Sequence, residues 1–254
     1  MPLLLALMFW GPPWAWFVFT LCSIALAGWE LLGMTHPEDA LARWACVLQS
    51  LMLSSGLYFY SDDARVLLSL IFGTTIVSVL LPLLRPGEIR SAGMRQMAGI
   101  AAPIYISLLV TMAIVFRDQG TDGPGYALLT LMLAWMADTG GYFGGRFFGK
   151  HKLYESISPK KTVEGFIGAL VGSTFASVLA ATTYLPSLPL SHALLFGPIA
   201  GCFGQLGDLA ESLLKRSTAT KDSGNLLPGH GGVLDRVDGL LIVSPLVLLY
   251  TLWC

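Results

Sequence analysis

The chain has 254 residues, of which 54% are hydrophobic and 12% are charged, and its formal net charge at pH 7 is -1. Soluble domains carry about 25% charged residues, so this chain has too few charges to cover a soluble surface. The composition also excludes a disordered segment, which needs low hydrophobicity. A disulfide scaffold is excluded because the four cysteines stand singly in apolar stretches. The sequence therefore predicts an integral membrane protein.

Apolar stretches of about 20 residues, the length of a helix that crosses a bilayer core, follow one another along the chain. The first stretch, 2–10, is too short to span, and we expect it to be the second half of a span that begins upstream of Met1. Eight full-length stretches follow: 14–32, 41–60, 64–84, 92–116, 126–148, 162–185, 192–214 and 236–253. The predicted fold is an all-α polytopic transmembrane helical bundle with eight full spans and one partial N-terminal span.

Positive charges indicate which ends of the spans face the cytoplasm. If the turn at 11–13 lies outside and the spans alternate, 13 of the 15 Lys and Arg residues fall on the inner side, and only Arg65 and Arg117 fall outside. Such a bias is typical of cytoplasmic loops. We expect residues 1–125 to form N-terminal transmembrane helices and residues 126–254 to form C-terminal helices that carry the functional site at the cytoplasmic face.

Charged residues concentrate in segment 208–238, which holds nine of them where 12% would give about four. On a helix, Asp208, Glu211, Ser212 and Lys215 share one face. Because an acid inside a membrane span is costly, it normally faces a cavity or a partner, and this favours a functional role for Asp208. Glu211 fits this role and fits equally the wetted cytoplasmic end of a helix.

The segment Leu-Pro-Gly-His-Gly-Gly-Val-Leu-Asp-Arg-Val-Asp, residues 227–238, combines glycines with both signs of charge. Gly231 and Gly232 allow backbone N–H groups to approach a ligand closely, and His230 between glycines is the histidine that we favour for a functional role. Asp235 and Asp238 have a spacing that suits a hard cation, although one of them could simply cap the following helix. The combination suggests a metal–polyphosphate site.

Two further features lie nearer the middle of the chain. Asp138 is another intramembrane acid, followed by glycines that repeat every four residues (140 and 144, 141 and 145), a pattern that favours close helix packing. Lys160 and Lys161 stand where an inner loop enters the next span. They fit either ordinary positive-inside charges or contacts to phosphate.

The segments 212–216, 221–222 and 227–238 together resemble the signature of the phosphatidate cytidylyltransferase family, and 138–152 and 158–165 resemble its middle region. The resemblance implies transfer of the cytidylyl group of CTP to phosphatidic acid, which gives CDP-diacylglycerol and pyrophosphate for phospholipid synthesis. It implies Mg²⁺ as the cofactor, with K⁺ as a second ion. It also implies a bacterial inner-membrane protein with a cytoplasmic active site, contacts with membrane lipids, a homodimer, and no nucleic acid partner.

The same resemblance implies roles for individual residues. Asp208 and Asp235 would hold the metal. The catalytic set would contain Asp208, Asp222, Asp235, Asp238 and Lys221. Substrate contacts would come from a larger set: Asp138, Lys160, Lys161, Ser212, Lys215, Arg216, His230, Gly231, Gly232 and Arg236.

Two other functions compete with this one. A CTP-dependent polyprenol or phytol kinase would transfer a terminal phosphoryl group and release CDP instead of pyrophosphate. A transporter would also place charges within the membrane, but transporters often carry internal repeats and sites near the midplane. Here no repeat is evident and the charges gather at the inner face.

Overall fold

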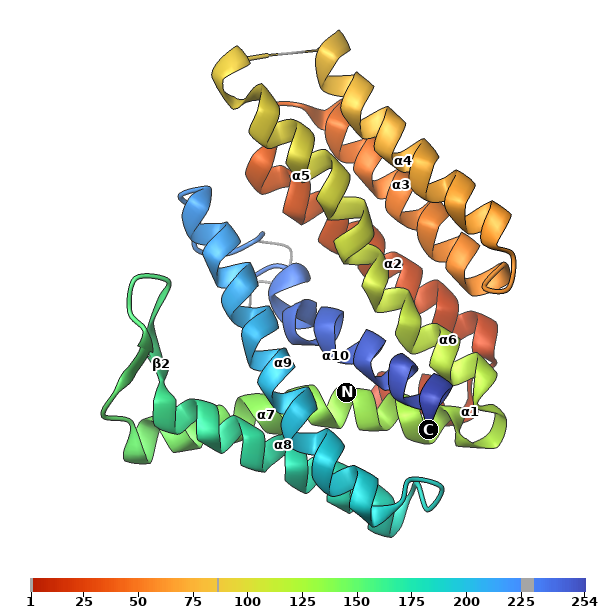
Figure 1. The fold of residues 1–254 in the computed structure, drawn as a ribbon, viewed down its shortest axis with the longest axis vertical. Helices are drawn as coiled ribbons and strands as arrows, with labels where there is room; N and C mark the ends of the chain where they lie inside the picture. Colours follow the sequence, from red (N-terminus) through yellow and green to blue (C-terminus); the bar gives the residue numbers. More distant parts are fainter. Residues whose placement is uncertain (1, 86, 225–230) are drawn as a thin grey trace. The chain divides into compact units, whose positions relative to one another are not determined.

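The computed structural model describes residues 2–85, 87–224 and 231–254, and helices make up most of this part of the chain (Figure 1). The all-α fold is therefore confirmed. The α-helices are α1 Pro2–Trp10, α2 Pro13–Thr35, α3 Ala40–Phe59, α4 Ala64–Leu84, α5 Ile89–Ser107, α6 Thr111–Asp118, α7 Gly123–Phe148, α8 Val163–Thr183, α9 Leu190–Ser217 and α10 Leu234–Trp253. Short 3₁₀ helices, Leu108–Val110 and Gly120–Asp122, flank α6.

Within the described residues, six helical stretches are long and apolar enough to cross a membrane: Pro13–Thr35, Ala64–Leu84, Ile89–Asp118, Val163–Thr183, Leu190–Ser217 and Leu234–Trp253. Two other predicted spans, 41–60 and 126–148, do form the helices α3 and α7. These two are less apolar because polar residues interrupt them, such as Arg43 and Gln49 in α3 and Asp138 in α7.

The chain forms two compact units, each assembled from separate segments. The first unit comprises Met1–Trp16, Met112–Ser217 and Val237–Cys254, and the second comprises Phe17–Thr111 and Thr218–Arg236. These units are defined by spatial contacts between residues, whereas the predicted division at residue 125 separates N-terminal from C-terminal helices along the sequence. The predicted division stays a prediction.

In the first unit, glycines bring α7 and α8 into backbone contact. A Cβ atom added at Gly140 would lie 2.2 Å from the carbonyl oxygen of Gly168, and one added at Gly172 would lie 2.1 Å from that of Met136. Small residues allow such close approach in membranes, where apolar side chains gain little by leaving lipid. The packing role predicted for the glycine repeat of α7 is therefore confirmed.

The strands β1 (Lys152–Tyr154) and β2 (Ser158–Thr162) form an antiparallel hairpin in the first unit. The hairpin stands beyond the end of α7 and leads into α8 (Figure 1). Thr162 ends β2 and caps α8, because its Oγ1 accepts a hydrogen bond from Gly165 N at 3.1 Å. The sequence predicted only a loop here. A hairpin of such short strands carries too weak an alternation to be recognised.

In the second unit, buried hydroxyl and amide groups join the helices α3, α4 and α5. Ser78 donates to the side chain of Gln49 and to the carbonyl of Gly99, at 3.2 and 2.8 Å. Ser107 donates to the carbonyl of Ser50 at 3.1 Å. Each bond satisfies a polar group that would otherwise be costly inside a bilayer.

Candidate functional site

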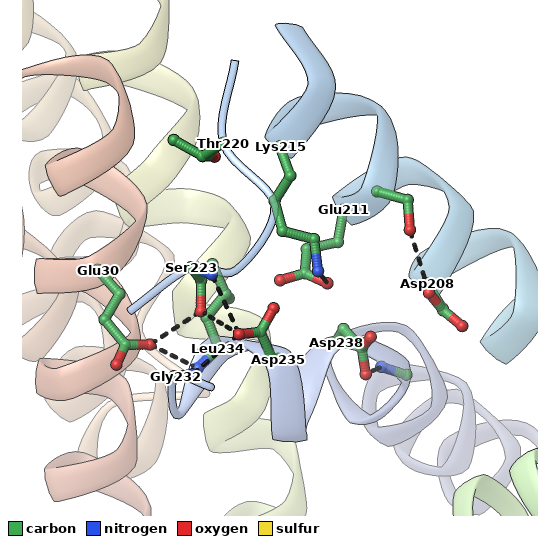
Figure 2. A network of polar contacts seen from close by, with 12 residues as sticks. Glu30, Asp208, Glu211, Lys215, Thr220, Ser223, Gly232, Leu234, Asp235 and Asp238 are labelled. Atoms are coloured by element: carbon green, nitrogen blue, oxygen red, sulfur yellow. Dashed lines mark hydrogen bonds and ion pairs between the residues drawn. The ribbon is translucent and has the colours of Figure 1, made fainter. Parts of the chain in front are cut away.

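Three carboxylates gather in the first unit, in the C-terminal half of α9 and the first turns of α10. Asp208 and Glu211 come from α9 and lie one turn apart, and Asp238 comes from the first turns of α10. Each offers an oxygen atom, and these atoms all lie within 4.8 Å of one another. Glu211 is only 1% exposed, so its interpretation as a wetted helix end is wrong. Figure 2 shows all three side chains.

Two lysines neutralise part of this acid cluster. Lys161, at the end of β2, lies with its Nζ 2.6 Å from Asp208 Oδ2. Lys215, one turn beyond Glu211 on α9, lies with its Nζ 2.9 Å from Glu211 Oε2. Three carboxylates and two ammonium groups leave one negative charge in excess among these five side chains.

The donor set of the acid cluster fits a hard divalent cation. Mg²⁺ prefers oxygen ligands and commonly takes one or two carboxylates together with substrate phosphates. Carboxylates this close together repel one another, and with little surrounding water that repulsion is costly unless a cation compensates it. Asp208, Glu211 and Asp238 are thus the residues that could hold such an ion in this unit.

Lys160 and Lys161 are held in place by contacts at the base of the hairpin. Glu164, in the first turn of α8, accepts hydrogen bonds from the backbone of Lys150 and His151 at 3.0 and 3.3 Å. Its other oxygen lies 2.6 Å from His151 Nδ1. These contacts tie the end of α7 to the start of α8. They fix the strand that carries both predicted phosphate-binding lysines.

A cavity of about 340 Å³ lies beside the acid cluster and is entirely within the first unit. Asp208 belongs to both features. Several predicted substrate-binding residues meet here, because Asp138, Lys160 and Lys161 line the cavity. Gln205, one turn before Asp208 on α9, also lines it and was not identified from the sequence. Its position one turn before Asp208, on the polar face of the same helix, is the signal that could have indicated it.

Other predicted residues of the first unit lie on α9 beside the cluster. Ser212 donates to Asp208 Oδ1 at 3.4 Å. Arg216 reaches the hairpin and donates from Nε to the carbonyl of Ile157 at 3.4 Å. Both residues therefore support neighbouring groups in this structure, and their predicted contacts with substrate stay predictions.

In the second unit, Asp235 organises the segment that precedes α10. Its Oδ2 accepts hydrogen bonds from Ser223 N and Oγ, both at 3.0 Å, and from Gly232 N at 2.9 Å (Figure 2). The amide of Gly232, predicted to meet a substrate, thus contacts a carboxylate here. The metal-binding role predicted for Asp235 stays a prediction.

Glu30 of α2 holds the same segment from the other side (Figure 2). It is 8% exposed and accepts from Val233 N at 3.0 Å, Leu234 N at 2.8 Å and Ser223 Oγ at 3.2 Å. A Cβ atom at position 232 would lie 2.4 Å from Glu30 Oε2, so any larger residue there would displace the Glu30 carboxylate. The sequence interpretation missed Glu30, although an acid within an apolar span is a sufficient signal.

The remaining predicted residues of the second unit are more exposed. Lys221, Asp222 and Arg236 are exposed, and Asp222 lines a cavity of about 540 Å³ together with Glu30. Gly231 has a φ of 76°, a conformation that glycine adopts without strain. His230 lies outside the described residues.

Comparison with known proteins shows to which family the chain belongs. The sequence model of the cytidylyltransferase family matches residues 1–254. Over 145 residues, 57% of this chain, the sequence is 45% identical to the phosphatidate cytidylyltransferase of Bacillus subtilis (strain 168), and the match covers 54% of that protein. Over 132 residues, 52% of this chain, it is 47% identical to the phosphatidate cytidylyltransferase of Staphylococcus haemolyticus (strain JCSC1435), with 51% of that protein covered. The chain spans about half the length of these curated relatives. It belongs to the cytidylyltransferase family.

Proposed function

We propose that the protein transfers the cytidylyl group of CTP to phosphatidic acid and thereby forms CDP-diacylglycerol and pyrophosphate. The observation that carries this proposal is the acid cluster of Asp208, Glu211 and Asp238 with Lys161 and Lys215 beside it. Two polyanions must meet in this reaction, so the site needs groups that neutralise phosphate. The names of the relatives support the same reaction.

The chain's own residues supply both signs of charge that the reaction needs. Lys161 and Lys215 can exchange their carboxylate partners for phosphate oxygens without long movements, because each already lies at the edge of the cluster. The attacking phosphate of the lipid is already an anion, so the site needs no strong general base. Lys160 is exposed beside the cavity and is suited to hold a phosphate that enters from the cytoplasm.

We assign Asp208, Glu211 and Asp238 as candidate ligands of Mg²⁺, with Asp235 as a further candidate from the family resemblance. When bound, the ion would neutralise phosphate charge and stabilise the departing pyrophosphate. K⁺ as a second ion and assembly as a homodimer also rest on the resemblance. Asp222 and Lys221 remain proposed catalytic residues on the same basis.

We further propose eight full membrane spans, an inner-membrane location and a cytoplasmic active site. The helices α3 and α7 are 20 and 26 residues long, which is sufficient to cross a bilayer. The placement of 13 of 15 basic residues on one side supports the orientation.

The proposed reaction is tested with purified protein in detergent micelles. CTP labelled at the α-phosphate, phosphatidic acid and Mg²⁺ should yield a labelled product that partitions into organic solvent, together with one pyrophosphate per product. Release of CDP with a polyprenol as the acceptor would instead identify a kinase. No labelled lipid across a range of lipid and Mg²⁺ concentrations would refute the proposal.

A further inference from the structure

The cavity beside the acid cluster has the size and position of a nucleoside site. Its volume of about 340 Å³ lies near the lower end of the range for small-molecule sites, about 300–1,000 Å³. Asp208 lines the cavity and also belongs to the acid cluster. A nucleotide whose phosphates reach the acid cluster would therefore place its ribose and base in this cavity.

Asp138 and Gln205 present an acceptor and a donor next to each other in this cavity. Gln205 is 7% exposed, and its Nε2 donates to Asp138 Oδ1 at 3.4 Å. An ionised carboxylate can only accept hydrogen bonds, so Asp138 orients the Gln205 amide with its nitrogen toward the carboxylate. The backbone oxygen of Gln205 also accepts from Lys161 Nζ at 3.5 Å. This contact keeps the pair close to a predicted phosphate ligand.

The residues around the pair leave the Gln205 amide uncovered on the side of Gly141. A Cβ atom added at Gly141 would be in van der Waals contact with Gln205 Nε2, at 4.0 Å, so glycine at this position keeps a side chain off the amide. Tyr142 and Phe166 line the same cavity. Aromatic rings of this kind provide surfaces on which a base can stack.

We propose that Asp138 and Gln205 recognise the Watson–Crick edge of cytosine and so select CTP over UTP. This inference rests on the proposed function. Cytosine carries its N4 amino donor next to the N3 acceptor, which matches a carboxylate acceptor beside an amide donor. Uracil has the reverse order, an O4 acceptor beside an N3–H donor, and would place O4 against the carboxylate. Asp138 is exposed on the side of the helix that lines the cavity, whereas the Gln205 amide is buried, so the wrong base would set its N3–H donor against a buried donor and leave that donor unpaired.

Asp138→Asn and Gln205→Leu test the assignment in different directions. The asparagine offers an amide donor to uracil O4, so the ratio of kcat/KM for UTP to that for CTP should rise by about tenfold or more. The leucine removes the donor to N3, so KM for CTP should rise while the already weak use of UTP changes little. Gln119→Leu, in the turn after α6 and away from the cavity, is the matched control and should leave the ratio unchanged.

Nucleotide binding without lipid provides the second measurement. Calorimetric titration of each purified variant with CTP and with UTP, in the presence of Mg²⁺, should show the same change in preference. If Asp138→Asn fails to fold, as judged by thermal unfolding in detergent, Gln205→Leu alone decides. Unchanged base preference in the folded variants would overturn the inference.

The outcomes also separate this inference from the proposed reaction. A protein that binds CTP and not UTP, loses this preference in the variants, and yet forms no CDP-diacylglycerol would contradict only the reaction. A protein that forms CDP-diacylglycerol while its variants keep the wild-type preference would contradict only the recognition of cytosine.

Discussion

Replacing Glu30 by alanine should release the segment before α10. In the second unit, the Glu30 carboxylate accepts from two backbone amides, Val233 N and Leu234 N, and from Ser223 Oγ. Ser223 Oγ keeps Asp235 Oδ2 as an acceptor, so two buried backbone donors lose theirs, at a cost of about 1–3 kcal/mol each. Because water can enter and replace part of the loss, we expect a total of about 3 kcal/mol. A glutamine at this position keeps one carbonyl acceptor and should lose about 1 kcal/mol.

Hydrogen exchange followed by mass spectrometry gives this local free energy directly. A loss of about 3 kcal/mol corresponds to more than a hundredfold faster exchange, confined to a peptide that covers 231–236. Glu38→Ala is the matched control, because Glu38 is an exposed acid between α2 and α3. Exchange of this peptide at the wild-type rate in Glu30→Ala would show that the carboxylate does not hold the segment.

Three other predictions concern the acid cluster, the helix packing and a buried histidine. Glu211→Gln should raise the Mg²⁺ concentration needed for half-maximal activity at least tenfold. Asp62→Asn, in the turn between α3 and α4, should leave this concentration unchanged. Equal Mg²⁺ curves for the two variants would exclude Glu211 as a ligand. Gly140→Leu should lower the Tm measured in detergent by several degrees, because even the Cβ atom of the leucine would lie 2.2 Å from a carbonyl oxygen of α8. Gly93→Leu is the control, because nothing lies within 4 Å of a Cβ atom added there. Equal Tm values for the two variants would refute the close packing of α7 and α8. Burial and, to a smaller extent, the nearby Arg95 lower the pKa of His36 from its ordinary value of 6.5. The folded state therefore binds fewer protons than the unfolded state, and Tm should fall as the pH drops below 6.5. A His36→Gln variant with the same pH dependence of Tm would contradict this prediction.

The helices could be predicted from sequence because an apolar run of about 20 residues has few alternatives in a membrane. Leu190–Ser217 and Ala64–Leu84, for example, form helices close to the predicted bounds. The polar face of α9 was also predictable, since Asp208 and Glu211 are one turn apart on any helix. The periodicity of one helix therefore gave two of the three members of the acid cluster.

The partners of the buried acids, Glu30 among them, could not be predicted, because these partners come from distant parts of the chain. The pairing of Glu30 with the segment at 232–234 spans about 200 residues of sequence, and no local pattern encodes such a contact. The hairpin that delivers Lys161 to Asp208 is likewise set by its contacts with the ends of α7 and α8. Sequence spacing indicates which residues share a helix face, whereas tertiary packing decides which faces meet.

Within the first unit, one face of α9 serves both for packing and for chemistry. Gly201 lies so close to α8 that an added Cβ would be 2.1 Å from Ser173 Oγ, and Ser173 donates across to the carbonyl of Gly197 at 2.7 Å. Gln205 and Asp208 follow Gly201 at i+4 and i+7, so they continue the same face toward the C-terminal end of the helix. Backbones in such close contact cannot slide past one another without clashes. The small residues in the membrane therefore fix the register in which Asp208 meets Lys161. A site that depends on charged groups a few ångströms apart needs a scaffold of this rigidity.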